Sequence, residues 1–344
     1  PAPLCMVLPI MRENARMVIH RLGESFRDCT QIRRDSCAEP GPGEVLIRNH
    51  FAGVNGVYDQ MMCLDKVEHT RVTPPADTGV EAIGIVEAVG DGVVSPNPGQ
   101  SVVTVKVGQG YRHWQLSSAE DAIPVPHVAP EVLALIPSGV SALVALEQVG
   151  ELTTGETVLI TAAAGGLGNV MTQLAVEADN HVIAVCGTAD KAAWLASVGA
   201  DRVINYRNES PGAVLASEYA DSIDLAMDSV GGDVFDVLVD HLAPRGRLVI
   251  CGYTSDRHPT ALVNSERIYT KLYWKAASVR GFMNFRFAEH GPDARTRLLD
   301  RYRRGDLRPL VDRQQFAGLE SVADAVDYLL AGRNLGKVVV DLRD

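Results

Sequence analysis

The sequence has 344 residues and a formal net charge of −11, with 32 Lys and Arg against 43 Asp and Glu. Its hydrophobic fraction of 46% and charged fraction of 22% are those of a globular protein, which excludes a disordered or fibrous chain. The length exceeds what one hydrophobic core usually supports, so we expect two domains. The acidic balance disfavours a protein that follows the phosphates of a nucleic acid.

Cysteine usage and hydropathy indicate the expected compartment. The six cysteines form no CxxC pair, which favours free thiols in a reduced, cytoplasmic setting. The apolar opening PAPLCMVLPIM has no basic segment before it and is interrupted by Pro3 and Pro9, so we expect no signal peptide. The longest uncharged stretch near the middle, Val132 to Leu146, contains Pro137 and is shorter than the ~20 residues that span a membrane.

Residues 15 to 125 are predicted to form short strands separated by turns. A Gly-Pro-Gly turn at 41–43 precedes an alternating apolar run that begins at Val45, and further apolar segments cover 82–90 and 101–107. Glycine and proline residues, which are typical of turns, occur throughout this part of the chain. The pattern predicts a small β-barrel-like domain.

After about Pro130 the pattern changes to strands that alternate with helices. The strands are continuously apolar, which indicates a parallel sheet covered on both faces and therefore a doubly wound α/β domain. The predicted strands cover 157–161, 181–185, 203–206, 225–228, 247–251 and 337–340, and the predicted helices cover 168–178, 191–198 and 319–330.

A glycine-rich turn follows the first strand of this α/β part. Residues 163–168 have the spacing A-x-G-x-x-G between a buried strand and a helix. Gly165 and Gly166 allow the backbone to approach a pyrophosphate, and the helix N-terminus supplies N–H groups and a positive dipole. Gly168 allows close packing of the helix against the strand. We interpret the segment as a dinucleotide-binding turn; the alternative is a plain tight turn between strand and helix.

The end of the next strand favours NADPH over NADH. An NAD site usually carries Asp or Glu there, which binds the ribose hydroxyls. Here the strand is followed by Cys186-Gly187-Thr188-Ala189 without an acid, and Lys191 comes soon after. A carboxylate would repel a 2′-phosphate, whereas a lysine and small donors would bind it. The alternative for Lys191 is an ordinary surface position.

Short segments along the whole chain resemble the medium-chain dehydrogenase/reductase superfamily. In the order of that family they are GVN at 53–55, DTGVEAIGIV at 77–86, AAAGGLG at 162–168, INY at 204–206, DSVGG at 228–232 and GKVVV at 336–340. The resemblance is greatest to the zinc-free quinone oxidoreductase branch and, within it, to the prostaglandin reductase 3 group. It implies a Rossmann domain with a parallel sheet, over 129–286, inserted into a GroES-like β-barrel domain formed by 1–128 and 287–344.

The resemblance also implies cofactor-binding roles for individual residues. Around the two phosphate groups it implies Ala164, Gly165, Gly166, Leu167, Gly187, Thr188, Lys191 and Tyr206. Around the nicotinamide and its ribose it implies Asn55, Ser229, Val230, Cys251, Gly252, Tyr253, Phe282 and Met283, with Asn334 and Lys337 closing over the cofactor. The alternative for Tyr206 and Ser229 is a plain strand-end position, and for Cys251 a place in the core.

No metal site is expected, although the superfamily includes zinc enzymes. The positions that resemble those of its catalytic zinc ligands hold Asn55, Val80 and Ser138. Valine cannot coordinate a metal, and the amide and hydroxyl are poor zinc ligands. The four closely spaced cysteines of a structural zinc loop are also missing, since residues 64–185 contain no Cys.

Without a Lewis acid, alcohol oxidation is difficult and reduction of an activated C=C bond is easier. Hydride transfer from NADPH to the β-carbon of an enone, enal or enoyl thioester leaves an enolate, which needs a donor at its oxygen and a proton at the α-carbon. Asn55 is the first candidate for an active-site amide near the nicotinamide. Tyr58 and Tyr253 are candidate donors. The segment around Tyr58 departs from the family pattern N-x-x-D-x-x-Y, and the alternative for Tyr253 is core packing.

We therefore expect an NADPH-dependent C=C reductase, for which the resemblance implies chemistry like that of a 15-oxoprostaglandin 13-reductase. Two alternatives stay open: an NADPH:quinone oxidoreductase and a non-catalytic NADPH-binding protein. The expected partners are a small α,β-unsaturated carbonyl or quinone substrate and, as in relatives, a second copy of the chain in a homodimer. We expect no nucleic acid and no membrane span.

Overall fold

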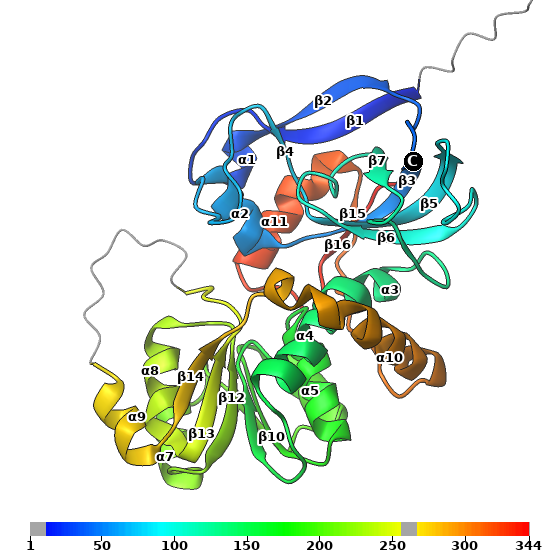
Figure 1. Cartoon of the computed structure of the whole chain (residues 1–344). Coiled ribbons are helices and arrows are strands. Elements are labelled where there is room, and N and C mark those ends of the chain that lie inside the picture. The colour runs from blue at the N-terminus through cyan, green and yellow to red at the C-terminus, as the bar shows by residue number, and fades with distance from the viewer. Residues whose placement is uncertain (1–11, 256–266, 344) are drawn as a thin grey trace, which may run out of the picture. The chain divides into compact units, whose positions relative to one another are not determined.

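A computed structural model describes residues 12–255 and 267–343, which form two compact units (Figure 1). Of the described residues, the contacts assign 12–133, 315–331 and 339–343 to unit 1. The described residues of unit 2 are 134–255, 267–314 and 332–338. The chain therefore leaves unit 1 for unit 2, returns to unit 1, and contributes one further short segment to unit 2 before it ends in unit 1.

Unit 2 is built on a six-stranded parallel sheet. Its strands are β9 (Thr157–Ile160), β10 (His181–Cys186), β11 (Arg202–Asn205), β12 (Ile223–Asp228), β13 (Leu242–Ile250) and β14 (Ser278–Gly281). Their spatial order is β11-β10-β9-β12-β13-β14, and every pair is parallel. This order, in which the first strand lies beside both the second and the fourth, is that of a dinucleotide-binding Rossmann sheet. The predicted fold class is confirmed.

Two hydrophobic clusters cover the two faces of this sheet. Along β9, Val158 and Ile160 belong to one cluster, whereas Leu159 between them belongs to the other. Successive side chains of a strand point to opposite faces, so both faces are buried. The helices of unit 2 are α4 (Val140–Val144), α5 (Gly168–Glu177), α6 (Ala189–Ser197), α7 (Pro211–Glu218), α8 (Gly232–His241), α9 (Tyr269–Lys275) and α10 (Gly291–Arg304), with a 3₁₀ helix η3 at Asn284–His290.

One long helix connects the two units in sequence. It runs over Pro130–Val149 as α3 (Pro130–Ala134), η1 (Leu135–Gly139), α4 and η2 (Ala145–Val149), where η1 and η2 are π-helical. The wider π turn at η1 contains Pro137, which lacks the N–H that a regular helix would use. The helix is longer than the predicted apolar run of residues 132–146. By length and composition it could cross a membrane, but 78% of its apolar window is buried, as in a core helix of a globular protein.

Unit 1 consists mainly of antiparallel β-structure. One three-stranded sheet has the order β2-β1-β4, and a second sheet has the order β15-β16-β3-β5-β6-β8 with β7 on β3. The strands are β1 (Arg12–Ile19), β2 (Thr30–Cys37), β3 (Glu44–Gly53), β4 (Ala76–Asp77), β5 (Glu81–Val89), β6 (Ser101–Val105), β7 (Trp114–Ser118), β8 (Ile123–Pro124), β15 (Phe316–Ala317) and β16 (Val339–Asp341). The helices are α1 (Phe26–Cys29), α2 (Gly56–Cys63), η4 (Leu319–Ser321) and α11 (Val322–Leu330).

The contact-based division of the chain differs from the predicted domain boundary after residue 286. We expected 287–344 to complete the first domain, but residues 287–314 pack within unit 2. In α10, Ala294 and Leu298 are buried in the cluster that covers one face of the parallel sheet. The return to unit 1 begins at residue 315, where β15 and α11 follow, and β16 then pairs with β3 at the Gly53–Val339 register.

Candidate functional site

The glycine-rich turn lies at the carboxyl end of β9 and leads into α5. Gly165 N–H donates to the Ala162 carbonyl at 2.8 Å, and Ala162 itself has a positive φ of 47°. A methyl group added at Gly168 would lie 2.4 Å from the Ala162 carbonyl oxygen and 2.7 Å from the Ala163 Cα. The predicted role of Gly168 in close packing of helix and strand is therefore confirmed, since neither backbone atom can move aside.

Asn169 fixes this turn, and the sequence analysis missed it. Its side chain is fully buried, and its Nδ2 donates to the carbonyls of Gly165 and Gly166 at 2.8 Å each. Its Oδ1 accepts from the N–H of Leu310 at 3.0 Å. The amide thus joins the turn to the chain segment after α10. The only sequence feature that could have indicated this role is a single Asn at the start of an otherwise apolar helix face.

Residues 332–338, which we call the strap, lie against the glycine-rich turn. Gly336 N–H donates to the Ala164 carbonyl at 2.8 Å, and Asn334 Nδ2 donates to the Gly336 carbonyl at 2.8 Å. Lys337 is 4% exposed, and its Cδ would lie 3.2 Å from a methyl group added at Gly166. The structure therefore brings Asn334 and Lys337 to the turn formed by the predicted pyrophosphate residues Ala164, Gly165, Gly166 and Leu167.

A second group of predicted residues gathers at the carboxyl ends of β10 and β11. The Tyr206 hydroxyl would lie 2.4 Å from a methyl group added at Gly187, so the absence of a side chain there makes room for the phenol. Thr188 caps α6, because its Oγ1 accepts from the N–H of Lys191 at 3.3 Å. Gly187, Thr188, Lys191 and Tyr206 thus lie together, with no carboxylate at the end of β10.

Lys191 is positioned by the strap. Its Nζ donates to the carbonyl of Gly332 at 2.8 Å. Burial lowers the pKa of Lys191 and the positive charge of Arg207 lowers it further, while Cys186 and the carboxylate of Asp312 oppose this shift in part. Arg207 is therefore a second cation near Lys191, which the sequence analysis did not name. The available signal was a basic residue directly after the Ile-Asn-Tyr segment at 204–206.

Asp228 organises the next part of this edge. Its carboxylate is fully buried and accepts from Thr161 Oγ1 at 2.7 Å, from the N–H of Val230 at 2.9 Å and from the N–H of Gly231 at 3.1 Å. Thr161 Oγ1 in turn accepts from the N–H of Ser229 at 2.9 Å. These bonds fix the predicted residues Ser229 and Val230 between the ends of β9 and β12. We call this set of bonds the Thr161–Asp228 network.

The ends of β13 and β14 complete the edge. A methyl group added at Gly252 would lie 3.2 Å from the Ser229 carbonyl oxygen, so the two segments are in close contact. Burial and the nearby Asp228 raise the pKa of Cys251 to about 12, so its thiol is not a nucleophile. The N–H of Phe282 donates to the Ile250 carbonyl at 2.9 Å. Tyr253 and Met283 are both about half exposed.

The two remaining predicted residues belong to unit 1. Asn55 is the N-cap residue of α2, and its N–H donates to Asp59 Oδ2 at 3.2 Å. Asp59 is buried and also accepts from the Tyr111 hydroxyl at 2.7 Å, and burial together with Asp59 raises the pKa of Tyr111 well above its usual value. The start of α2 is thus fixed by a buried pair that the sequence analysis did not name.

Tyr58 lies in the first turn of the same helix. A hydrogen bond of 3.0 Å joins its Oη to Nε2 of His69, and the two rings stack with centroids 5.9 Å apart. Burial and the adjacent Asp59 raise the pKa of Tyr58 to about 12. The phenol therefore stays protonated at any physiological pH, as a proton donor requires.

The residues at the zinc-ligand positions do not fit a metal. Asn55, Val80 and Ser138 offer one amide, one alkyl group and one hydroxyl, which is not a zinc-binding set. Within residues 12–255 and 267–343, no three His, Cys, Asp or Glu side chains form a cluster that could hold a metal ion.

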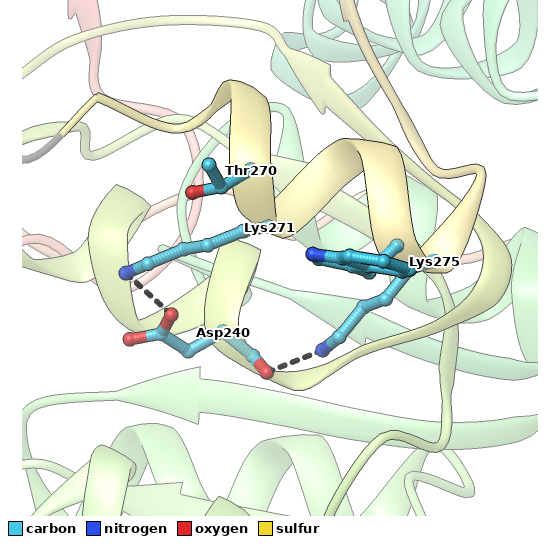
Figure 2. Close-up of a pocket in the computed structure, with 5 residues that line it drawn as sticks. Asp240, Thr270, Lys271 and Lys275 are labelled. Atoms are coloured by element: carbon cyan, nitrogen blue, oxygen red, sulfur yellow. Dashed lines mark hydrogen bonds and ion pairs between the residues drawn. The ribbon is translucent and has the colours of Figure 1, made fainter.

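A shallow hollow of about 240 Å³ lies elsewhere on unit 2, between α8 and α9 (Figure 2). Its lysines are paired with carboxylates: Lys271 Nζ contacts Asp240 at 2.5 Å, and Lys275 Nζ contacts Asp221 at 2.6 Å. This hollow lies beside the amino end of β13, whereas the residues predicted to bind the cofactor lie at the carboxyl ends of the strands. We assign it no part in the candidate site.

The carboxyl edge of the unit 2 sheet has the chemistry of a site for a phosphorylated dinucleotide. It offers a glycine-rich turn, a helix N-terminus of positive polarity and Lys191, whose Nζ is held by the Gly332 carbonyl. Ligands of open α/β sheets bind at this edge, where the strand order reverses.

Comparison with known proteins agrees with this architecture. Residues 41–126 match the alcohol dehydrogenase GroES-like domain, and residues 198–340 match a family described as zinc-binding dehydrogenase. The chain is 41% identical to prostaglandin reductase-3 of Mus musculus, over 97% of this chain and 90% of that protein. It is 34% identical to a probable quinone oxidoreductase of Leishmania amazonensis, over 95% of this chain and 98% of that protein.

A solved structure shows the same fold. The quinone oxidoreductase of Escherichia coli, complexed with NADPH, superposes with a TM-score of 0.82 at 25% identity, covering 95% of this chain and 99% of that one. The chain belongs to the medium-chain dehydrogenase/reductase superfamily. The predicted resemblance to the prostaglandin reductase 3 group is confirmed as well.

Proposed function

We propose that this protein is an NADPH-dependent reductase of C=C bonds conjugated to a carbonyl group. The observation that carries the proposal is the carboxyl end of β10, where the Tyr206 hydroxyl packs against Gly187, Lys191 lies in the first turn of α6 and the strand ends without an acidic residue. This arrangement suits a 2′-phosphate and disfavours NADH. The similarity to prostaglandin reductase-3, and to an oxidoreductase complexed with NADPH, supports the same conclusion.

The residues of unit 2 would bind and orient the cofactor. Gly165, Gly166 and the N-terminus of α5 would hold the pyrophosphate, while Lys191 and Arg207 would hold the 2′-phosphate. The Thr161–Asp228 network would fix the loop at the nicotinamide ribose. Bound NADPH would supply the hydride that reaches the β-carbon of the substrate.

Asn55 and Tyr58, the other two residues predicted from the sequence, would act on the substrate after the hydride has been added. Negative charge then lies on the carbonyl oxygen, where the Asn55 amide would donate a hydrogen bond. The α-carbon must receive a proton, for which the protonated phenol of Tyr58 is suited. Both residues lie at the start of α2, which Asp59 and Tyr111 hold in place.

Stopped-flow oxidation of NADPH with a panel of enones and enals tests this function. We expect turnover of enones with NADPH and at least about tenfold weaker binding of NADH, since one charge-assisted phosphate contact contributes about 1.5–3 kcal/mol. Reduced products identified by mass spectrometry must carry two additional hydrogens. The proposal is wrong if NADPH binds but no enone or enal is reduced.

A second candidate function is the reduction of quinones. The 34% identity to a probable quinone oxidoreductase favours it. Benzoquinone and naphthoquinone in the same assay separate the two functions. Quinone turnover well above that of every enone would favour the second function.

We also propose that the chain forms a homodimer through the free edge of β14. This strand lies at the end of the parallel sheet, and the adjacent α9 exposes Tyr273 and Trp274 to 76% and 82%. The N–H of Phe282 points toward β13, so by strand alternation the N–H of Gly281 points outward. An exposed edge of this kind is a template for pairing with a second strand.

The variant Gly281→Pro tests the dimer because proline removes the outward N–H. A methyl group at Gly281 meets no atom within 4 Å, so Gly281→Ala is a matched control that keeps the N–H. Light scattering after size exclusion should give twice 37.0 kDa for the wild type and for Gly281→Ala, and 37.0 kDa for Gly281→Pro. A monomeric wild type would exclude the dimer.

We propose a cytoplasmic location as well. Five cysteines within the described residues are free thiols, which suits a reducing compartment; Cys5 lies outside those residues. Fractionation of the native organism's cells with detection of the untagged protein tests the location.

A further inference from the structure

Two amide side chains, one helical turn apart on α5, hold the chain segment that follows α10. Asn169 Oδ1 accepts from the N–H of Leu310 at 3.0 Å. Gln173 Oε1 accepts from the N–H of Arg308 at 2.9 Å, and its Nε2 donates to the Arg308 carbonyl at 3.1 Å. Residues four apart share one face of a helix, so the two amides bind alternate residues of one segment. We call residues 308–312 the α10 extension.

The α10 extension also binds the strap. Lys337 N–H donates to the Leu310 carbonyl at 2.8 Å, and Asp312 N–H donates to the Lys337 carbonyl at 2.8 Å. A parallel bridge pairs Val311 with Lys337. A methyl group added at Gly336, whose φ is 91°, would overlap the Leu310 carbonyl oxygen. The α10 extension thus fixes the register of the strap, with a glycine at the closest approach.

The strap and Asn169 both bind the glycine-rich turn. Asn169 Nδ2 donates to the carbonyls of Gly165 and Gly166 at 2.8 Å each. The N–H of Gly336 donates to the Ala164 carbonyl at 2.8 Å, and Gly336 also forms a parallel bridge with Gly165. The turn, Asn169, the α10 extension and the strap therefore form a closed ring of hydrogen bonds, which lies entirely within unit 2.

This ring sets the direction of the N–H groups of the turn. In a trans peptide the N–H points opposite to the carbonyl of the same peptide unit. Because Asn169 binds the carbonyls of Gly165 and Gly166, the N–H groups of Gly166 and Leu167 point away from its buried side chain. In the described part of the chain, neither of these two N–H groups has a hydrogen-bond partner. Backbone N–H groups of this kind suit a pyrophosphate, whereas carbonyl oxygens would repel it.

We propose that Asn169 is the positioning residue for the pyrophosphate of NADPH, because its one side chain directs two N–H groups of the turn and ties the turn to the strap. This inference rests on the proposed NADPH-dependent function and concerns its cofactor alone. Asn169 is fully buried and acts through the turn. The part of the cofactor near Lys191 is outside its reach, since Lys191 is held by Gly332 instead.

Gln173 provides a matched control for Asn169. Both side chains are amides on the same face of α5, and both hold the α10 extension. The Nε2 of Gln173 donates to the carbonyls of Asn169 and Arg308 at 3.1 Å each, and not to the turn. Loss of either amide should loosen the α10 extension, whereas only loss of Asn169 should change the direction of the turn N–H groups.

Three ligands separate positioning of the pyrophosphate from a general loss of structure. NADPH carries both the pyrophosphate and the 2′-phosphate, NADH carries only the pyrophosphate, and adenosine 2′-monophosphate carries only the 2′-phosphate. Calorimetric titration of the full chain gives the Kd of each ligand. The proteins compared are the wild type and the variants Asn169→Ala, Gln173→Ala and Lys191→Gln.

We expect Asn169→Ala to raise the Kd of NADPH and of NADH alike, by at least about tenfold, since both depend on the turn. Its Kd for adenosine 2′-monophosphate should stay within about twofold of the wild type, as should all three values for Gln173→Ala. Lys191→Gln should show the opposite pattern, with weaker NADPH and adenosine 2′-monophosphate and unchanged NADH.

The outcomes separate this inference from the proposed function. If the wild type binds NADPH but Asn169→Ala keeps its affinity, or if Asn169→Ala loses affinity for all three ligands in equal proportion, the positioning role is wrong and the proposed function stands. If the wild type does not bind NADPH, both are wrong. Should thermal melting show that Asn169→Ala is unfolded, Asn169→Ser is judged by the same criteria. Its hydroxyl can donate one turn back to Gly165, as Thr172 donates to the Gly168 carbonyl at 2.9 Å.

Discussion

At the scale of single residues, the glycines of the candidate site differ in the atoms that an added methyl group would contact. At Gly187 it would meet the end of the Tyr206 side chain, which is 55% exposed and can rotate away. At Gly168 it would meet backbone atoms that cannot yield. The same mutation at the two positions should therefore have different consequences.

We predict that Gly187→Ala weakens NADPH binding several-fold and leaves the free energy of unfolding within about 0.5 kcal/mol, because only an exposed ring is displaced. Gly168→Ala should lower the free energy of unfolding by about 1–3 kcal/mol, because it overpacks the strand and helix. Fluorescence titration with NADPH and urea denaturation measure the two quantities. Equal destabilisation by both variants would contradict the argument.

A second prediction concerns Lys191. Lys191→Gln should raise the Kd of NADPH about tenfold at neutral pH and leave the Kd of NADH unchanged, since only NADPH carries the 2′-phosphate. Burial lowers the pKa of Lys191, so its ammonium loses its charge at lower pH than that of a surface lysine. The preference of the wild type for NADPH should therefore decline at a lower alkaline pH than it would if Lys191 had the pKa of a surface lysine. A parallel change of both Kd values would count against the assignment.

At the scale of elements, the Thr161–Asp228 network connects the ends of β9 and β12. We predict that Thr161→Val, which keeps the shape but loses the hydroxyl, lowers the free energy of unfolding by about 1–3 kcal/mol and raises the Kd of NADPH. Thr161→Ser keeps both hydrogen bonds and is the control. Denaturation and NADPH titration of the two variants check the prediction, which fails if valine and serine behave alike.

The sequence predicted the elements that carry a strong pattern. The apolar strands β9, β10 and β12 and the helix α5 were expected almost at their observed bounds, because buried parallel strands and a glycine-rich turn have local signals. The partners Asn169, Arg207 and Asp228 were not predicted as site residues. Their roles depend on atoms that are distant in sequence, such as Leu310 N–H for Asn169. The predicted cofactor contacts themselves stay predictions.

At the scale of the whole molecule, one ion pair fixes the start of the parallel sheet. Arg247 contacts both carboxylate oxygens of Glu156 at 2.7 and 2.9 Å, and both side chains are less than 15% exposed. Burial alone would raise the pKa of Glu156, but the hydrogen bonds from Arg247 and Thr153 and the charge of Arg247 together outweigh it and lower the pKa. A lowered carboxyl pKa stabilises the fold above the ordinary Glu pKa, and this stabilisation is lost as the pH falls through the folded-state pKa.

We predict that Glu156→Gln lowers the free energy of unfolding by about 3–5 kcal/mol at pH 7, because it leaves Arg247 buried without a charged partner. The difference from the wild type should shrink below the ordinary Glu pKa, about 4.3, as the wild-type carboxylate becomes protonated. Urea denaturation at pH 7 and at acid pH measures it. A difference that does not depend on pH would refute the role of the charge.

The division of the chain was predicted only in part. Two units and a late return to the first were expected from length and resemblance. The packing of α10 within unit 2 was not expected. The sequence of this helix is highly charged and does not indicate which sheet its few apolar residues cover. Ala294 and Leu298 identify its partner only once the fold is formed.

The strap has a consequence for synthesis of the protein. All other residues of unit 2 have been translated by Gln314, but the strap follows only after β15 and α11 of unit 1. A ribosome-bound chain that ends at Ala331 has the complete parallel sheet but lacks Asn334 and Lys337. If Asn334 and Lys337 bind NADPH as predicted, the cofactor reaches its full stabilising effect on unit 2 only after residues 332–338 have left the ribosome.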